Sequence, residues 1–253
     1  MKTEVITSRA NPLCAHFRKL AGHRAYREAC GEFLCDSPKL LEEALRWGAE
    51  LATVAFTEKC PPPELPGHVR CVRVSEGVME AISPMKTPQG VVFSCRMADT
   101  RPPRPLPAGR YVVLEGVQDP GNVGTILRTA DAFGWTAVLL EDCADLYSPK
   151  TLRAGMGAHF RRRTYQYDLE TLARIFEKAD IPLYAAALRG DTRDVRAADL
   201  ARCAVIIGSE GRGVSERALA LCDGTLKIPM EPCCESLNAA AAAAVVLWEG
   251  YRR

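Results

Sequence analysis

The chain has 253 residues, of which 47% are hydrophobic and 25% charged, with a formal net charge of +2. These values are typical of a globular protein with one or two domains. The net charge is too small to indicate nucleic-acid binding by itself. Basic clusters at residues 18–27 and 161–163 are compatible with phosphate contacts, but equally with an ordinary solvated surface. No apolar stretch approaches the roughly 20 residues that span a bilayer, so we expect no membrane association.

The eleven cysteines point to a reducing compartment. The start of the chain lacks the apolar region of a signal peptide, so we expect reduced thiols and a cytoplasmic location. There is no Cys-x-x-Cys pair, and the histidines have no metal-ligand spacing, so we expect no metal. Cys233-Cys234 could form a redox pair, although cysteines more often act as small hydrophobic residues.

The N-terminal part, residues 1–96, reads as a small α/β domain. Helical spacing covers residues 13–29, and residues 32–34 form a short strand candidate. Ser37 as N-cap and Pro38 at the first helical position predict a helix that continues over 39–47. We expect further strands at 51–56, 69–74 and 91–95, and a short helix at 75–82.

A proline-rich segment, residues 97–109, follows this part. It contains Pro102, Pro103, Pro105 and Pro107, a spacing that favours an extended, semi-rigid linker. We therefore place a domain boundary here.

Residues 110–253 alternate between strands and helices. We expect strands at 111–117, 136–140, 163–167, 183–188, 203–207 and 226–230. We expect helices at 122–133, 169–178, 214–221 and 236–251. The continuous apolar strands predict an α/β fold whose mainly parallel sheet has helices on both faces.

Polar, glycine-rich loops follow three of these strands. In the first, residues 118–124, Asn122 is a good N-cap for the next helix. Capping does not explain Arg128, two turns further on, whose planar guanidinium suits an anion such as phosphate. It could equally point into solvent.

The second loop, residues 208–213, has the spacing Gly-x-x-Gly-x-Gly, which is not that of a P-loop or a dinucleotide-binding loop. Its glycines allow a ligand close to the backbone, and a tight turn alone would not need the carboxylate of Glu210. In the third loop, Glu235 and Ser236 are plausible capping residues of an alanine-rich helix.

Loops that follow parallel strands emerge at the same edge of the sheet, where ligands bind. Five polar side chains from these loops can therefore converge on one site: Asn122, Arg128, Glu210, Ser236 and Asn238.

Together, the loops resemble the three signature motifs of the SpoU-TrmH class of RNA ribose 2′-O-methyltransferases, in the SPOUT superfamily. The first motif is matched by Asp119, Pro120, Asn122, Gly124, Arg128, Ala130, Phe133 and Gly134. The second is matched by Gly208, Glu210, Gly211 and Gly213, and the third by Ile228, Pro229, Met230, Ser236, Leu237 and Asn238. Residues 154–160 resemble a further family segment. The third motif departs from the family at Pro232, where glycine is usual.

This resemblance covers residues 110–253. A weaker one covers residues 1–96, which resemble the ribosomal-protein-like RNA substrate-binding domain that many members carry. The resemblance of residues 110–253 to the methyltransferase class implies a C-terminal trefoil knot, a homodimer and the cofactor S-adenosylmethionine. The cofactor positions correspond to Gly208, Ile228, Leu237, Met230, Leu188 and Gly190. The catalytic and substrate-contacting positions correspond to Arg128, Asn122, Glu210, Ser236 and Asn238.

The implied reaction is methyl transfer to a ribose 2′-hydroxyl of RNA, with ribosomal RNA, such as a 23S-type guanosine, as the leading substrate. Transfer RNA is the alternative within the class. A non-catalytic RNA-binding or ribosome-assembly factor on the same fold is the alternative outside it. A dinucleotide-dependent oxidoreductase does not fit, because no Gly-x-Gly-x-x-Gly follows a strand.

Overall fold

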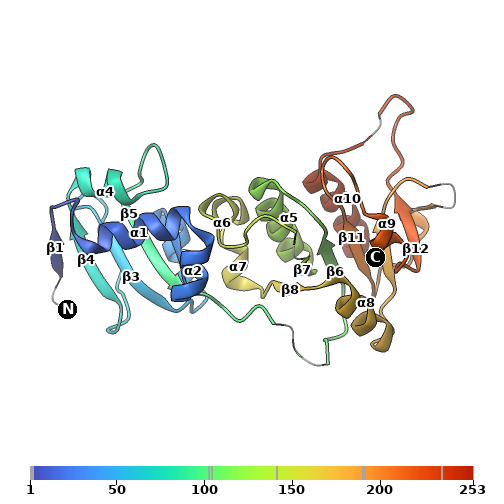
Figure 1. Ribbon diagram of the computed structural model, residues 1–253, viewed down its shortest axis with the longest axis horizontal. Helices are drawn as coiled ribbons and strands as arrows, with labels where there is room; N and C mark the ends of the chain where they lie inside the picture. The colour runs from blue at the N-terminus through green and yellow to red at the C-terminus, as the bar shows by residue number, and fades with distance from the viewer. Residues whose placement is uncertain are drawn as a thin grey trace. The chain divides into compact units, whose positions relative to one another are not determined.

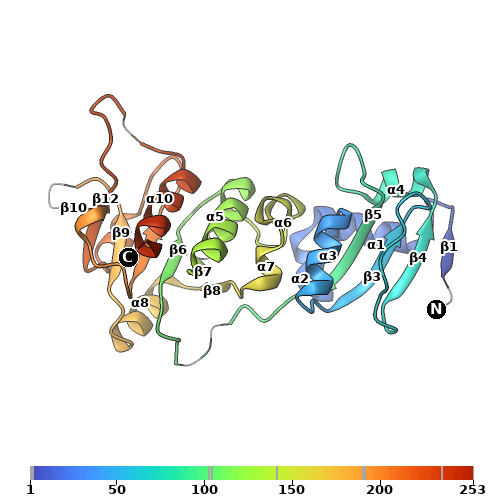
Figure 2. The same ribbon diagram turned by 180° about the vertical axis from the view of Figure 1, so that it is seen from behind.

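The protein is described from a computed structural model (Figures 1 and 2), which describes residues 3–101, 103, 105–140, 142–189, 192–234 and 236–252. The chain forms two compact units. The N-terminal unit combines Met1–Ala98 with Asp145–Arg161, and the C-terminal unit combines Asp99–Ala144 with Arg162–Arg253. The chain therefore passes from one unit to the other three times.

The N-terminal unit contains a five-stranded mixed sheet in the order β1-β4-β3-β5-β2. Its strands are β1 (Glu4–Ile6), β2 (Glu32–Asp36), β3 (Leu51–Phe56), β4 (Arg70–Val74) and β5 (Val91–Arg96). The strand β4 pairs in parallel with β1 and β3, whereas β5 is antiparallel to β2 and β3. The sequence did not predict β1, because three residues are too short to show a strand period.

The helices of this sheet are α1 (Pro12–Gly22), α2 (Arg24–Cys30), α3 (Pro38–Arg46) and α4 (Glu76–Ile82). The predicted cap of α3 is confirmed, because Ser37 accepts a hydrogen bond from the backbone N–H of Leu40. The single helix expected over 13–29 is wrong. It is divided at His23, whose extended backbone (φ −125°) ends α1.

Residues 145–161 belong to the N-terminal unit, although they lie in sequence within the predicted methyltransferase region. They form α6 (Pro149–Gly155) and α7 (Ala158–Arg161), neither of which the sequence predicted. Three ion pairs hold them: Arg27–Asp145, Arg153–Asp36 at 3.4 Å and Arg161–Glu43 at 2.5 Å. The ring of Tyr147 also lies 4.7 Å from that of Phe33 on β2.

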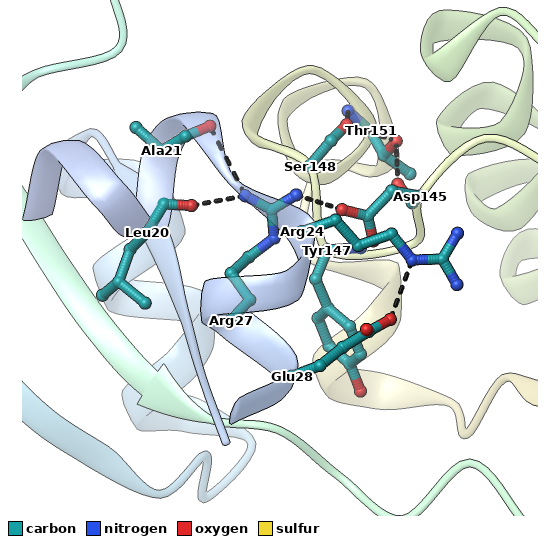
Figure 3. Close-up of polar contacts among 9 residues, drawn as sticks. All are labelled: Leu20, Ala21, Arg24, Arg27, Glu28, Asp145, Tyr147, Ser148 and Thr151. Carbon is teal, nitrogen blue, oxygen red and sulfur yellow. Dashed lines mark hydrogen bonds and ion pairs between the residues drawn. The ribbon is translucent and has the colours of Figure 1, made fainter. Parts of the chain in front are cut away.

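Arg27 is the most buried cation of this arrangement (Figure 3), with 4% of its surface exposed. Its Nη1 donates to the carbonyl oxygens of Leu20 and Ala21 in the last turn of α1, at 2.5 and 3.5 Å. Its Nη2 donates to the carboxylate of Asp145, whose other oxygen accepts from the backbone N–H of Tyr147. One buried guanidinium thus joins the end of α1 to the turn before α6.

The C-terminal unit contains a seven-stranded sheet in the order β10-β12-β9-β11-β6-β7-β8, and every paired strand is parallel. Its strands are β6 (Tyr111–Leu114), β7 (Thr136–Leu140), β8 (Tyr165–Tyr167), β9 (Leu183–Ala186), β10 (Arg193–Asp194), β11 (Ala204–Ile207) and β12 (Gly224–Lys227). The expected parallel sheet is confirmed. The two-residue β10 was not predicted, and several strands end earlier than expected.

Both faces of this sheet carry helices. These are α5 (Pro120–Phe133), α8 (Leu169–Lys178), α9 (Glu216–Leu219) and α10 (Ala239–Tyr251), with a short 3₁₀ turn, Val195–Ala197, after β10. One core joins Phe176 of α8 and Ala218 of α9 to alternate strand residues such as Val113 and Ile206. On the opposite face, α5 and α10 lie side by side in both views and contact β7 and β11.

The structure corrects two predicted helix starts. The N-cap of α5 is Asp119, which accepts from the N–H groups of Gly121 and Asn122, so Asn122 lies within the first turn. The reason is Pro120, whose fixed φ favours the first helical position and leaves the preceding residue as the cap. The cap of α10 is Asn238 rather than Ser236, and Glu235 lies outside the described residues.

Within the described ranges, no helix is long and apolar enough to cross a membrane. The same part of the chain contains no group of three or more His, Cys, Asp or Glu side chains arranged to hold a metal ion.

Candidate functional site

A pocket of about 610 Å³ lies within the C-terminal unit, where three neighbouring strands end. Residues 186–189 come from the end of β9 and the loop after it, and residues 207–214 from the end of β11 and the turn after it. Residues 226–228 and Met230 come from the end of β12 and the loop that follows. Because these strands are parallel and adjacent, their carboxyl ends meet at one edge, as expected for a ligand site. The volume lies within the range of small-molecule pockets, about 300–1,000 Å³.

The turn after β11 is tight. Ser209 and Gly213 exchange two backbone hydrogen bonds, of 3.1 and 2.9 Å. A Cβ on Gly208 would lie only 2.1 Å from the carbonyl carbon of Gly213, and Gly213 itself has a φ of +67°. Glycine at both positions therefore lets the backbone fold back on itself beside the pocket.

Glu210, which lines this pocket, is held by donors from the first loop. Its carboxylate accepts from the side-chain amide of Asn122 at 2.8 Å and from the N–H groups of Gln118 and Asp119 at 3.2 and 3.3 Å. Asn122 in turn accepts from the side-chain amide of Asn238 at 3.1 Å. Three of the predicted catalytic residues thus form one hydrogen-bonded chain, Asn238–Asn122–Glu210.

The hydrogen bonds to Glu210 keep its carboxylate ionised. Burial alone would raise the pKa of Glu210, but the hydrogen bonds from Asn122 and the backbone together lower it below its ordinary value. The site therefore contains a fixed negative charge rather than a proton donor.

The other two predicted catalytic residues, Arg128 and Ser236, do not take part in this row of hydrogen bonds. Arg128 lies exposed on α5, and its side chain makes no hydrogen bond or ion pair with the residues that the structure describes. Ser236 is exposed and lines the pocket. Arg128 does not line the pocket, and its guanidinium is available to a ligand that lies outside the pocket.

The predicted cofactor positions gather around the pocket. Its lining includes Leu188, Gly208, Ile228, Met230 and Leu237, while Gly190 lies outside the described residues. Apolar side chains and glycines both line the pocket, a combination suited to a nucleoside-containing ligand. These residues therefore fit the implied cofactor.

Sequence reasoning missed two pocket features. Arg212 lines the pocket from the tip of the second loop, and Arg189 pairs with Glu216 at 3.2 Å. The sequence could have indicated Arg212, because it is the one long cationic side chain between two glycines in this turn.

Comparisons with known proteins agree with this arrangement. Residues 109–248 match the SpoU rRNA Methylase family, and residues 11–92 match the MRM3-like substrate binding domain. A solved structure of an AdoMet-bound rRNA methyltransferase from Sinorhizobium meliloti is 28% identical, with a TM-score of 0.86 over 99% of this chain and 98% of that one.

Two curated relatives differ in the RNA that their names give. The chain is 32% identical to the 23S rRNA (guanosine(2553)-2′-O)-methyltransferase RlmP of Bacillus subtilis, over 88% of this chain and 89% of that protein. It is 40% identical to the tRNA (guanosine(18)-2′-O)-methyltransferase of Thermus thermophilus, over 56% of this chain and 74% of that protein. The match over more than half of its length shows that the chain belongs to the SpoU rRNA methylase family.

Proposed function

We propose that this chain transfers the methyl group of S-adenosylmethionine to a ribose 2′-hydroxyl of RNA. The observation that carries this proposal is the Asn238–Asn122–Glu210 chain beside a nucleoside-sized pocket. It brings all three predicted motifs together at the carboxyl edge of the sheet. The ribose oxygen would attack the methyl carbon, the carbon–sulfur bond would break, and S-adenosylhomocysteine and a proton would leave.

In this proposal, the bound cofactor supplies an already activated methyl group, so the protein acts mainly by positioning. Leu188, Gly208, Ile228, Met230 and Leu237 would hold the cofactor, together with Gly190. Arg128 would bind the neighbouring RNA phosphate through its planar fork and stabilise charge developing on the ribose oxygen. A guanidinium stays protonated in proteins, so we favour this role over that of a base.

The remaining predicted catalytic residues would position the substrate. The Asn122 amide and the ionised Glu210 would keep the first and second loops in register, since Glu210 accepts from both the side chain and the backbone of the first loop. Ser236, exposed on the pocket wall, would contact the ribose.

Ribosomal RNA is the substrate that we propose, such as a 23S-type guanosine. The supporting observation is the Bacillus relative, which matches across both units of this chain. The match of residues 11–92 to a substrate binding domain also favours a large, structured RNA. Transfer RNA is the second candidate, because the Thermus relative is more identical over the part that it matches.

We further propose a homodimer with the trefoil knot of the family, no required metal and a cytoplasmic location. An exposed aromatic group supports the dimer: Trp248 and Tyr251 of α10 are about half exposed and lie 5.4 Å from the ring of Phe133. Exposed apolar groups of this kind often mark subunit interfaces. The free state of all eleven cysteines is compatible with a reducing compartment.

The direct test is transfer of radiolabelled methyl from S-adenosylmethionine to unmodified RNA, separated into ribosomal and transfer RNA. We expect label in ribosomal RNA ribose, reduced at least about 100-fold by Arg128→Ala, the scale of losing one transition-state charge contact. Arg128→Lys should restore little of it, because lysine cannot form the planar fork.

Arg174→Ala is the matched control, since Arg174 is an exposed arginine on α8 with only local partners. It should label RNA at the normal rate. Label in transfer RNA alone would replace the substrate with the second candidate. Absence of both labelling and cofactor binding would contradict the enzymatic proposal and favour a non-catalytic RNA-binding factor.

A further inference from the structure

Three cations line the pocket of the C-terminal unit, namely Arg189, Arg212 and Lys227. Two of them have acidic neighbours. Arg189 pairs with Glu216 at 3.2 Å, and Lys227 is the register partner of Asp194 on the adjacent strand β10. The side chains of Lys227 and Arg212 make no hydrogen bond or ion pair with any described residue, but Arg212 lies in a loop and, unlike Lys227, has no acidic residue in register beside it.

The backbone at Arg212 is nevertheless well positioned. Its N–H donates to the hydroxyl of Ser209 at 3.3 Å, inside the turn that Ser209 and Gly213 close with two backbone hydrogen bonds. At Gly211, the residue before Arg212, an added Cβ would meet no atom within 4 Å apart from those of its chain neighbours. The turn thus holds the backbone of Arg212 at the pocket lining and leaves its side chain exposed.

An unpaired arginine in a pocket calls for an anionic ligand group, because its planar fork matches a carboxylate or phosphate with two parallel hydrogen bonds. Two sources are available if the proposed function holds, which this inference assumes. The cofactor carries an α-carboxylate on its methionine end, and RNA carries phosphates. Arg128, which does not line the pocket, is already the cation proposed for RNA, whereas Arg212 shares its pocket with the proposed cofactor residues.

We propose that Arg212 binds the α-carboxylate of S-adenosylmethionine and so distinguishes the intact amino-acid end of the cofactor. It acts as a binding residue at the end of the ligand remote from the methyl group. Glu210, two residues earlier in the same loop, holds the first loop, so one turn would serve both the cofactor and the reaction site.

The test compares two ligands that differ only in this group. Isothermal titration calorimetry of the full chain would measure the affinities of S-adenosylmethionine and decarboxylated S-adenosylmethionine. Arg212→Gln should weaken binding of the intact cofactor about tenfold and that of the decarboxylated one less than about twofold. Arg212→Lys should fall between wild type and Arg212→Gln, because it keeps the charge without the fork.

Arg217→Gln is the matched control, since it removes the same charge from an exposed residue of α9 that pairs with Glu170 outside the pocket. Both of its affinities should equal those of the wild type. An Arg212→Gln variant that binds the intact cofactor normally would overturn the proposal, as would an equal loss for both ligands, which would indicate damage to the loop.

A third result would show that the anion bound by Arg212 is an RNA phosphate and not the cofactor carboxylate. If Arg212→Gln binds both cofactors normally but raises the KM for RNA, Arg212 contacts a phosphate and the carboxylate assignment is wrong. Failure of the wild-type chain to bind S-adenosylmethionine would instead contradict the proposed function, and this assignment with it.

Discussion

Glu210 is the residue around which the candidate site is arranged. It lies in a glycine-rich turn that needs no carboxylate, yet it accepts from one side-chain amide and two backbone N–H groups of another loop. These donors lower its pKa against the opposing effect of desolvation. A charge held in this way is pre-oriented, so the loops need not reorganise when a ligand arrives.

His159, in the N-terminal unit, leads to a prediction about pH. Its Nε2 is buried with no hydrogen-bond partner among the described residues, and its ring lies 4.0 Å from Phe160 and 5.9 Å from Phe33. Burial, with a smaller effect of nearby Arg161, lowers the pKa of His159 to about 3 from 6.5. The unfolded chain therefore takes up this proton at a higher pH than the folded one.

The stability contribution of neutral His159 is complete above pH 6.5 and is lost as the pH falls toward 3. The loss approaches about 1.4 kcal/mol per pH unit within that window. His159→Leu should flatten the decline in the free energy of urea unfolding between pH 7 and 5. His68→Asn, at an exposed position, should keep the wild-type slope. Equal slopes for wild type and His159→Leu would show that His159 titrates normally.

At the scale of the elements, α5 and α10 form the layer that carries the first and third loops. Trp135, which lies two residues beyond the end of α5, is fully buried and donates from its indole N–H to the carbonyl of Leu247 on α10 at 3.1 Å. Gly250 makes this close approach possible. A Cβ there would lie 2.5 Å from Cζ2 of Trp135 and 3.3 Å from Cβ of Leu200.

Gly250→Ala should therefore destabilise the C-terminal unit by about 1–3 kcal/mol, because overpacking outweighs the better helix propensity of alanine. The change is measurable as a lower urea midpoint. Gly22→Ala is the matched helical control, since nothing lies within 4 Å of its added Cβ, and it should be neutral or slightly stabilising. A normal midpoint for Gly250→Ala would mean that the Trp135 contact is easily relaxed.

At the scale of the whole molecule, the N-terminal unit is built from two separate stretches of chain. The pair Arg27–Asp145 joins them within this unit (Figure 3); the Arg27 side chain is buried, and that of Asp145 is 19% exposed. Removing one partner of a buried pair leaves an uncompensated charge. We expect Asp145→Ala to lower the free energy of unfolding of this unit by about 3–5 kcal/mol.

Glu28→Ala provides the comparison, because Glu28 pairs with Arg24 on the exposed side of the same helix (Figure 3), where both side chains are about half exposed. Its cost should stay below about 1 kcal/mol. Urea unfolding measures both variants. Similar losses for the two would indicate that Arg27 is satisfied by the carbonyls of α1 without Asp145.

Local sequence signals predicted many elements well. The strands β3 and β7 and the helix α8 have the predicted bounds, because each combines a clear hydrophobic period with strong boundary residues. Local signals failed where an element is too short to show a period, as at β1 and β10. They also failed at α6 and α7, which lie inside a stretch identified mainly by its family resemblance.

The sequence by itself determined the parallel α/β class, the family and the identity of the polar loop residues, because these depend on periodicity and on motifs within short segments. Only the tertiary structure decided that Asn238, Asn122 and Glu210 form one hydrogen-bonded chain, that Arg212 lines the pocket with no side-chain partner among the described residues, and that residues 145–161 belong to the N-terminal unit. These features depend on contacts between residues far apart in the sequence, such as Asn122 and Asn238, which are 116 positions apart. Sequence spacing alone does not determine which of these side chains contact each other, because the contacts form only when the strands and helices pack together.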